Sequence, residues 1–286
     1  MGSRQPVRVC PSASCRFVDP DNDKEWVERN RSLPGYVRLV CISDTHSQHG
    51  SITTTKSPEG ADDTTPLPLG DVLIHAGDWT MDGEPDAIKE LSNWLAGQPY
   101  EHKVVIAGNH DLTFDTKYYP RLWRRFHDVQ HDCEAVRASL QHCTYLEDSG
   151  TTVKGLTLWG SPWTPTFFDW GFNLDRGEEI SEKWQLIPDD VDVLITHGPS
   201  YQILDFTKSR VHAGCADLKR EIQGRIKPRL NIYGHIHEGR GVAFDGTTVY
   251  VNAASVDLMY RPIWPPFVID VPLDRTKPIP LHFDDA

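Results

Sequence analysis

Residues 37–46, VRLVCISDTH, decide the fold class of this chain. The first six form an apolar run rich in β-branched residues and predict a strand. The polar residues Asp44, Thr45 and His46 follow directly, where the strand ends. The same arrangement, an apolar strand that runs into Asp, Asn or His, recurs four more times along the chain, so we expect a repeated structural role.

Further elements follow from the same patterns. Apolar runs predict strands at 71–76, 103–107, 156–159, 192–196, 230–233, 249–252 and 267–271. Apolar residues at helical spacing predict helices at 84–98, 176–187 and 216–226. The alternation of strands and helices, without a break in composition, predicts a single α/β domain with at least one mostly parallel sheet. The late strands suggest a second sheet, hence a sandwich flanked by helices.

The domain is expected to span residues 36–286. Residues 1–35 are polar and irregular, and the Pro34-Gly35 breaker closes them, so they predict an N-terminal extension with a short helix around residues 24–29. Residues 51–69 are rich in Thr, Pro, Asp and Gly and predict a surface loop.

Composition excludes several classes of protein. The 286 residues include 41 acidic and 29 basic side chains, which gives a net charge of -12. This balance argues against a long nucleic acid or an anionic membrane as partner, because both are bound through clustered Lys and Arg. We find no stretch of about 18 apolar residues and no secretory leader, and the six cysteines form no CxxC pair. The sequence therefore predicts a cytoplasmic protein with reduced thiols, and it leaves the oligomeric state open.

The polar residues at the five strand ends are the candidate functional residues. In α/β sheets, ligands bind beyond the carboxyl ends of parallel strands, so these side chains are expected to converge. Asp44 with His46, and His235 with His237, are spaced two residues apart and can share a face of extended backbone. The expected set comprises Asp44, His46, Asp78, Asn109, His197, His235 and His237.

This set predicts a metal centre. Imidazole, carboxylate and amide donors without thiolate suit Mn, Fe, Zn or Co. Seven donors are too many for one ion and suit two ions that share a carboxylate. Asp78, in a tight Gly-Asp turn, is the best candidate for the shared ligand.

The motifs DTH, GD, GNHD, THGP and GHIH, in this order, resemble those of the calcineurin-like metallophosphoesterases. The runs CISDTHSQ, IHAGDWT, SPWTPTFFDWGFNLDRG, THGPS and HIHEGRG are similar to those of the metallophosphoesterase-domain-containing branch. The resemblance covers residues 37–271. It implies a four-layer α-β-β-α sandwich of two mixed sheets flanked by helices.

The resemblance also implies a role for each residue. Asp44, His46 and His237 would hold one metal ion, Asn109, His197 and His235 the other, and Asp78 would lie between them. His110 would stabilise the substrate phosphate or protonate the leaving alkoxide, and Asp111 would orient its imidazole. Since some vertebrate members carry Gly in place of His235, its presence here leads us to expect a competent dinuclear site.

The expected activity is that of a metal-dependent phosphoesterase. A metal-bound hydroxide would attack phosphorus in line. The branch is associated with phosphodiesterase activity on cyclic nucleotides, including 2′,3′-cyclic forms, and on aryl phosphodiesters, so the expected partner is a small phosphoester. Manganese is the favoured cofactor.

Two alternatives keep the metals and change the function. The same fold could serve a non-phosphate hydrolysis or another Lewis-acid reaction, or it could be a regulatory metal-binding scaffold with vestigial catalysis. The chain lacks GxxxxGK[ST], GxGxxG and GxSxG, so readings as a motor NTPase, a dinucleotide oxidoreductase or an elbow-type esterase lack support.

The other notable residues have plainer interpretations. His75 is expected in the core or behind a ligand, and His49 at the pocket mouth or exposed on a loop. Asn252 is expected to position the adjacent loop, Glu238 to support a ligating histidine, and Arg240 to lie solvated on a loop. An aromatic stretch is expected to pack in the core, or else to form a wall of the substrate pocket: Trp163, Phe167, Phe168, Trp170 and Phe172. Surface or packing roles are expected for His102, His127, His131, His142, His212 and His282.

Overall fold

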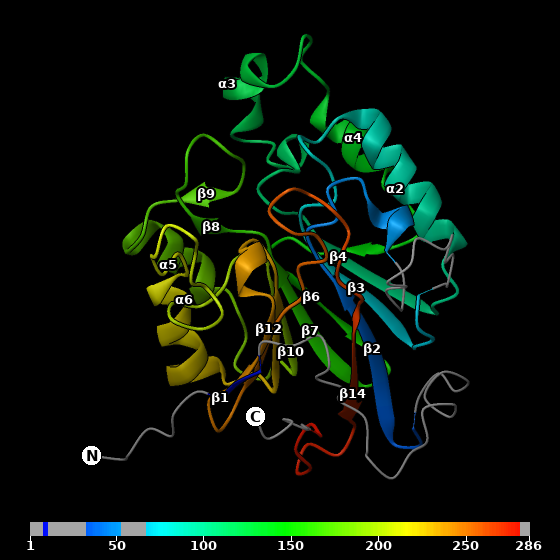
Figure 1. Ribbon diagram of the computed structural model, residues 1–286, viewed down its shortest axis with the longest axis vertical. Helices are drawn as coiled ribbons and strands as arrows, with labels where there is room; N and C mark the ends of the chain where they lie inside the picture. The colour runs from blue at the N-terminus through cyan, green and yellow to red at the C-terminus, as the bar shows by residue number, and fades with distance from the viewer. Residues whose placement is uncertain (1–7, 11–32, 53–66, 281–286) are drawn as a thin grey trace.

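The computed structural model describes residues 8–10, 33–52 and 67–280, and in it two β-sheets face each other with helices on their outer sides (Figure 1). The five-stranded sheet has the order β14 (Phe267–Pro272), β2 (Tyr36–Ile42), β3 (Val72–Ala76), β4 (His102–Ile106) and β5 (Thr144–Tyr145). β2 to β5 run parallel, and β14 pairs antiparallel with β2.

The seven-stranded sheet combines a parallel centre with antiparallel edges. Its order is β1 (Arg8–Cys10), β12 (Gly241–Phe244), β13 (Val249–Asn252), β11 (Leu230–Tyr233), β10 (Val193–Thr196), β7 (Leu156–Ser161) and β6 (Ser149–Val153). β13, β11, β10 and β7 are parallel, while β12 and β6 pair antiparallel with the outer two of these. A small sheet of β8 (Thr164–Pro165) and β9 (Asn173–Leu174) lies apart from both.

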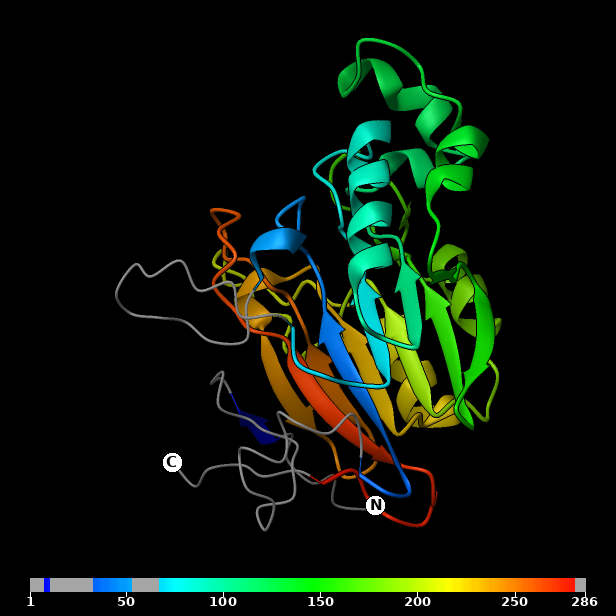
Figure 2. The same cartoon turned by 90° about the vertical axis from the view of Figure 1, so that its right-hand side faces the viewer.

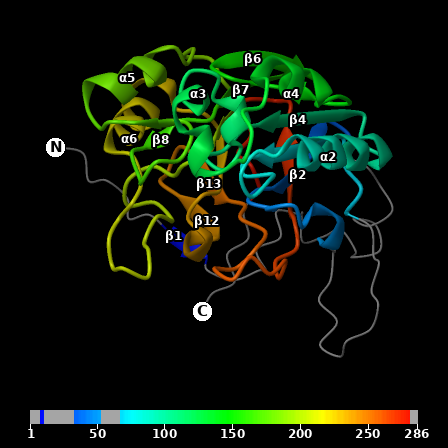
Figure 3. The same cartoon turned by 90° about the horizontal axis from the view of Figure 1, so that it is seen from above.

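The helices divide between the two outer faces. α2 (Pro85–Gly97) and α4 (Cys133–Ser139) lie on the side of the five-stranded sheet, and α5 (Glu178–Gln185) and α6 (Ala216–Glu221) on the side of the seven-stranded sheet (Figures 1 and 3). α3 (Tyr119–Leu122) projects beyond the sheets. Short helical turns complete the fold: η1 (His49–Ser51), η2 (Leu112–Phe114), η3 (Trp123–Arg125), the π-helical η4 (Ile222–Ile226) and η5 (His237–Gly239).

Side-chain alternation along β2 shows why both faces of the sheet are buried. Leu39 and Cys41 belong to the core between the sheets, together with Ile195 and Ile232 of the other sheet. Val40, one residue along, belongs to the core under the helices. Successive side chains of a strand point to opposite faces, so a strand buried on both faces reads as a continuous apolar run. The predicted sandwich of two mixed sheets flanked by helices is confirmed.

The predicted elements agree with the structure in position and differ at some ends. The helix predicted from residue 176 begins at Glu178, because Gly177 has a φ of 97° that no helix accommodates. β6, β12 and α4 were not predicted. Within the predicted extension, β1 pairs antiparallel with β12. The helix expected around residues 24–29 and most of the loop expected at 51–69 lie outside the described residues.

Two further observations concern the cysteines and the length of the helices. Cys41, Cys133, Cys143 and Cys215 are free thiols. Within residues 8–10, 33–52 and 67–280, no helix is both long enough and apolar enough to cross a membrane.

Candidate dinuclear metal centre

The predicted ligands follow the carboxyl ends of five parallel strands. Asp44 and His46 follow β2, and Asp78 follows β3. Asn109 follows β4, and the three remaining histidines follow β10 and β11 of the other sheet. Because the two sheets face each other, the ends of strands from both sheets meet at one edge of the sandwich (Figure 2).

One group of donors comprises Asp44, His46 and His237, whose ligand atoms all lie within 4.8 Å of one another. His237 Nε2 lies 3.4 Å from Asp44 Oδ1. The Nε2 atoms of His46 and His237 lie 3.3 Å apart. Two imidazole nitrogens and a carboxylate oxygen therefore face one another across a space of cation size.

The second group comprises Asp78, His197 and His235, again within 4.8 Å. His197 Nε2 lies 3.3 Å from Asp78 Oδ2 and 3.0 Å from Asn109 Oδ1. Asp78 Oδ2 also lies 3.8 Å from His46 Nε2, so this carboxylate stands between the two groups. The structure thus brings all seven predicted residues to one place.

Backbone carbonyls hold three of the imidazoles by the nitrogen that faces away from the centre. His46 Nδ1 lies 3.2 Å from the Thr80 carbonyl, and His197 Nδ1 lies 3.0 Å from that of Ala76. His237 Nδ1 lies 3.2 Å from the carbonyl of Asp257. A carbonyl only accepts, so each Nδ1 carries the hydrogen and Nε2 keeps its lone pair in the neutral ring, which is the usual arrangement of metal-ligating histidines.

Tight backbone geometry lets these side chains approach one another. Asp44, His46, Asp78 and His235 have φ values of 51°, 42°, 53° and 65°, in the left-handed region that costs free energy outside glycine. His235 N donates to both carboxylate oxygens of Asp44 at 2.9 Å. A Cβ at Gly234 would lie 1.8 Å from Asp44 Oδ2, so only glycine permits this approach.

The carboxylates of the centre are ionised. Burial raises the pKa of Asp44, but the hydrogen bond and charge of His237 outweigh it and lower the pKa to about 2. Burial also raises the pKa of Asp78, and His197 and His110 hold it well below its ordinary value. Both side chains are therefore anionic acceptors near neutral pH.

The pKa values of the histidines depend on burial and on the charges of their neighbours. Burial lowers the pKa of His46 to about 4 and that of His235 to about 3, so both are neutral donors at pH 7. Burial also lowers the pKa of His197, but Asp78 raises it to about 9. Metal binding must displace this proton, and cation uptake at such a site releases protons.

His110 lies beside the two groups. Its Nδ1 lies 2.7 Å from the Met81 carbonyl, and its backbone N donates to Asp78 Oδ1 at 2.8 Å. The ring of Trp170 stacks on it, with centroids 3.9 Å apart, and His46 lies edge-on at 4.7 Å. The imidazole is half-buried and held by both an aromatic face and a backbone acceptor.

The hydrogen bonds of Asp111 differ from the expectation that its carboxylate orients the His110 imidazole. Its carboxylate accepts hydrogen bonds from Gly108 N, Thr80 N and Thr80 Oγ1, at 2.8, 3.1 and 2.9 Å. It therefore ties the loop after β3 to the loop after β4. Met81, which no sequence pattern indicated, takes the position next to the His110 ring. Burial and the charge of Asp78 raise the pKa of Asp111 to about 7.

The aromatic stretch contributes both to the core and to the wall of the site, the two roles that the sequence left open. Trp163 and Phe172 are buried in the core, whereas Phe167 and Phe168 are exposed. Trp170 faces His110 at the site. Tyr260, which the sequence did not indicate, lies edge-on to His46 with centroids 4.7 Å apart.

Three polar side chains near His235 and His237 form hydrogen bonds with backbone groups. Asn252 Nδ2 donates to the Ile236 carbonyl at 2.8 Å and so positions the loop between the two ligands. Glu238 accepts from Lys208 N rather than from a histidine. Arg240 is not solvated as expected, because its guanidinium donates to the carbonyls of Ala254 and Pro265.

Two further histidines are buried behind the centre. His75 Nε2 lies 2.9 Å from Thr45 Oγ1, between the first two ligands in sequence, as expected for a supporting residue. His49 was expected at the surface or the pocket mouth, but it is only 3% exposed and its ring lies 5.1 Å from that of Trp94.

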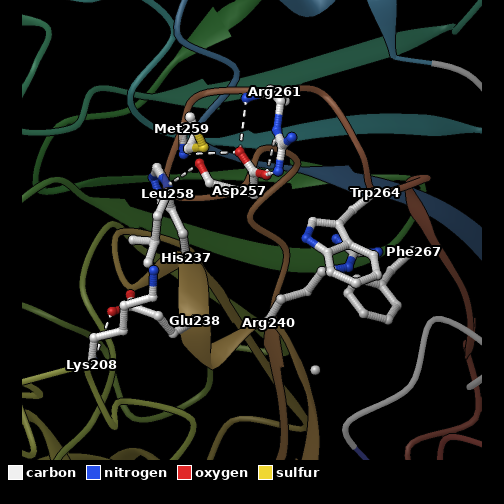
Figure 4. A pocket seen from close by; sticks show the side chains of 11 residues that line it. Lys208, His237, Glu238, Arg240, Asp257, Leu258, Met259, Arg261, Trp264 and Phe267 are labelled. Carbon is white, nitrogen blue, oxygen red and sulfur yellow. Dashed lines mark hydrogen bonds and ion pairs between the residues drawn. The ribbon is translucent and has the colours of Figure 1, made fainter. Parts of the chain in front are cut away.

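A cavity of about 380 Å³ adjoins the centre at His237 (Figure 4). Its walls include Leu258, Met259, Trp264 and the Asp257–Arg261 ion pair. A space of this size beside a candidate metal ligand is large enough for the organic part of a substrate.

The donor set fits two divalent cations. It supplies carboxylate, amide and imidazole donors in two groups, and Asp78 of one group lies 3.8 Å from His46 of the other. The group Asp78, His46 and His110 also satisfies the same distance criterion. Together, these donors support a dinuclear site for divalent metal ions.

Comparisons with known proteins agree with this site. The family model of the calcineurin-like phosphoesterases matches residues 37–239, a range that contains all seven predicted ligands. The chain is 47% identical over 253 residues to the metallophosphoesterase domain-containing protein 1 of Homo sapiens, and equally to that of Mus musculus, covering 85% of this chain and 74% of each relative. It is 36% identical over 277 residues to UPF0046 protein K07C11.7 of Caenorhabditis elegans, covering 88% of this chain and 89% of that protein.

Proposed function

The chain belongs to the calcineurin-like phosphoesterase family, whose members are metal-dependent hydrolases of phosphoesters, and we propose that it is a phosphodiesterase for small diesters, cyclic nucleotides included. The observation that carries this proposal is the placement of His110, which lies against the donor groups on one side and against the ring of Trp170 on the other. A proton donor and an aromatic surface thus adjoin the place where phosphorus would bind.

In this proposal the seven donors are shared between two ions. Asp44, His46 and His237 would hold one ion, Asn109, His197 and His235 would hold the other, and Asp78 would serve both. The distances within each group and the central position of Asp78 support this division. We favour manganese because three of the seven residues offer oxygen, which Mn²⁺ accepts readily beside imidazole.

Two bound divalent cations supply Lewis acidity, which activates water near neutral pH and neutralises charge on the phosphoryl oxygens. The chain contributes the arrangement that receives them. Ionised Asp44 and Asp78 provide negative charge, and carbonyl acceptors at Nδ1 fix the three imidazoles before any ligand binds. This prior order reduces the reorganisation that binding the transition state requires.

His110 acts as the general acid. The Met81 carbonyl accepts from Nδ1, so Nε2 is the nitrogen that gives a proton to the departing alcohol oxygen. Stacking on Trp170 restricts rotation of the ring. The proton therefore leaves from a fixed position beside Asp78.

The surroundings favour a diester over a monoester. A diester carries a second organic group, and the rings of Trp170 and Tyr260 flank the site at His110 and His46. The cavity beside His237 offers further space for such a group. A monoester has no second organic group to use these surfaces.

The test compares substrates at fixed Mn²⁺ after removal of bound metal. We expect turnover of bis(4-nitrophenyl) phosphate and of 2′,3′- and 3′,5′-cyclic nucleotides to exceed that of 4-nitrophenyl phosphate. We expect Asp78→Ala to lower kcat by at least about 10³-fold, because both ions lose a ligand. Circular dichroism of the variant is the control for folding.

Two outcomes would contradict the proposal. Equal rates in wild type and Asp78→Ala would remove the metal centre from the mechanism. A marked preference for the monoester, or for a carboxylic ester included as a non-phosphorus control, would replace the diester with another substrate class.

A further inference from the structure

A second cluster of potential ligands lies outside the centre described above. It comprises Glu84, His127 and His131, whose ligand atoms all lie within 4.8 Å of one another. Glu84 directly precedes α2, and both histidines lie in the loop between η3 and α4. This loop belongs to the part of the chain around α3 that projects beyond the sheets (Figures 1 and 2). The sequence had assigned both histidines only surface or packing roles.

The three side chains present their donor atoms to one another. His131 Nε2 lies 3.3 Å from Glu84 Oε2, and His127 Nε2 lies 3.7 Å from Glu84 Oε1. The two imidazole rings lie edge to face with centroids 4.8 Å apart. Asp82 Oδ1 lies 4.0 Å from His127 Nε2 and offers a further oxygen.

Both histidine nitrogens that face the cluster lack a hydrogen bond. His127 Nε2 and His131 Nε2 are buried and have no hydrogen-bond partner among the described residues. The His127 side chain is 0% exposed. A buried polar atom without a partner destabilises the fold, so two of them side by side call for a ligand.

Tyr119 fixes the orientation of His127. The Tyr119 hydroxyl lies 2.7 Å from His127 Nδ1 and also accepts a hydrogen bond from His131 N at 3.1 Å. A polar partner at Nδ1 that directs Nε2 inward is the arrangement that supports metal-ligating histidines. One hydroxyl thus holds the ring of one ligand and the backbone of the other.

An ion pair between protonated histidines and Glu84 explains the cluster less well. The contacts to His127 are too long for hydrogen bonds, and two cationic rings at this separation would repel each other.

We propose that Glu84, His127 and His131 form a separate mononuclear site for a divalent transition-metal ion, with zinc as the best match. Two imidazoles and a carboxylate are a common zinc donor set. Ligands about 2.0–2.2 Å from a tetrahedral zinc lie about 3.3–3.6 Å from one another. His131 Nε2 lies 3.3 Å from Glu84 Oε2, which matches this separation, and His127 Nε2 lies 3.7 Å from the other carboxylate oxygen. Asp82 or water completes the tetrahedron.

The position of the site gives it a structural role near the general acid. The carbonyl of Met81 accepts a hydrogen bond from His110 Nδ1. Asp82 follows Met81 directly, and Glu84 lies three residues after Met81. Phe126, adjacent to His127, packs on Trp170 with ring centroids 5.0 Å apart. An ion at this site therefore joins the segment that holds the His110 ring to the loop that supports Trp170.

The test counts bound zinc by mass spectrometry after the full-length protein is loaded and dialysed. We expect His131→Asn and Glu84→Gln each to hold one zinc fewer per chain than wild type, and the matched control His142→Asn to hold the wild-type amount. His142 is exposed and has a φ of 64°, which Asn tolerates. Anomalous scattering at the zinc edge should show the ion between the three side chains.

Hydrogen exchange gives a readout independent of catalysis. We expect zinc to slow amide exchange in residues 119–131 of wild type and not of His131→Asn. Glu84 is 45% exposed at its side chain, so Glu84→Gln keeps the test valid if the histidine variant does not fold. Equal zinc content in wild type and both variants would overturn the proposal. The difference of one ion is expected whether or not the main centre acts on phosphodiesters, so the two proposals fail separately.

Discussion

Asp78 has three partners within the centre, and they divide between its two carboxylate oxygens. Its Oδ1 accepts the backbone hydrogen bond of His110, and its Oδ2 lies near both His197 and His46. One short side chain therefore relates the two donor groups to the proposed general acid. The left-handed backbone at Asp78 and the positive φ of Gly77 make this central position possible.

The first prediction concerns His110. For His110→Asn we expect kcat on a substrate with an alkoxide leaving group to fall by about 10²–10⁴-fold, because general acid catalysis is lost. A 4-nitrophenolate leaving group needs little protonation, so kcat on bis(4-nitrophenyl) phosphate should fall much less. Steady-state kinetics on both substrates measure the difference.

Metal content is the control for this variant. His110 is assigned to proton transfer, so His110→Asn should bind the wild-type amount of metal. A loss of bound metal, or an equal loss of kcat on both substrates, would instead make His110 a ligand.

At the scale of the elements, a hydrogen bond connects the start of α5 to the first turn of α6. Asp217 lies in the first turn of α6, and its carboxylate accepts from Gly177 N, which precedes α5, at 2.9 Å. The same carboxylate accepts from Arg220 at 2.7 Å. Burial raises the pKa of Asp217, but these hydrogen bonds outweigh it and lower the pKa below the ordinary value of 3.8.

The second prediction therefore concerns pH. A carboxylate with a lowered pKa in the folded state stabilises the fold above about pH 4, and this contribution is lost as pH falls through the folded-state pKa. We expect Asp217→Asn to lower the free energy of unfolding at pH 7 by about 1.5–3 kcal/mol, and by less as the pH approaches 3.5. Urea unfolding over this pH range measures the difference.

Asp86→Asn is the matched control for Asp217→Asn. Asp86 also lies in a first helical turn, but its side chain is 96% exposed. We expect its substitution to change the free energy of unfolding by less than about 0.5 kcal/mol at any pH. If both variants behave alike, the link between α5 and α6 does not contribute as inferred.

At the scale of the whole molecule, the two sheets are tightly packed against each other at Gly160 of β7. A Cβ at this position would lie 2.6 Å from Ile106 Cγ2, which belongs to the other sheet, and 2.5 Å from Leu146 Cβ. Ile106 ends β4, directly before the loop that carries Asn109 and His110. The spacing of the sheets and the placement of the site are thus linked at one residue.

The third prediction follows from this contact. We expect Gly160→Ala to lower the free energy of unfolding by about 1–3 kcal/mol, because the added methyl group overpacks the core between the sheets. Gly224→Ala, where nothing lies within 4 Å of the added Cβ, should not destabilise the protein. Thermal and urea unfolding of the two variants provide the comparison, and equal stability of Gly160→Ala and wild type would show that the sheets adjust freely.

Local sequence patterns were sufficient for much of the fold. The run VRLVCI predicted β2 because a strand buried on both faces must be apolar at successive positions. Strands with weaker patterns escaped prediction. β6, with the sequence SGTTV, has an alternating exposed face and few apolar residues, and β12 is a four-residue strand that begins with Gly241.

The sequence by itself determined which seven side chains gather at the candidate metal centre, because polar residues at the carboxyl ends of neighbouring parallel strands lie at the same edge of a sheet. Only the tertiary structure decided what surrounds them. Met81 rather than Asp111 meets the His110 ring, and Tyr260 reaches His46, because these contacts join segments distant in sequence. The cluster of Glu84, His127 and His131 was not predicted for the same reason. Glu84 and His127 are 43 positions apart and follow no strand pattern, so only packing of the loop around α3 against the start of α2 brings their donors together.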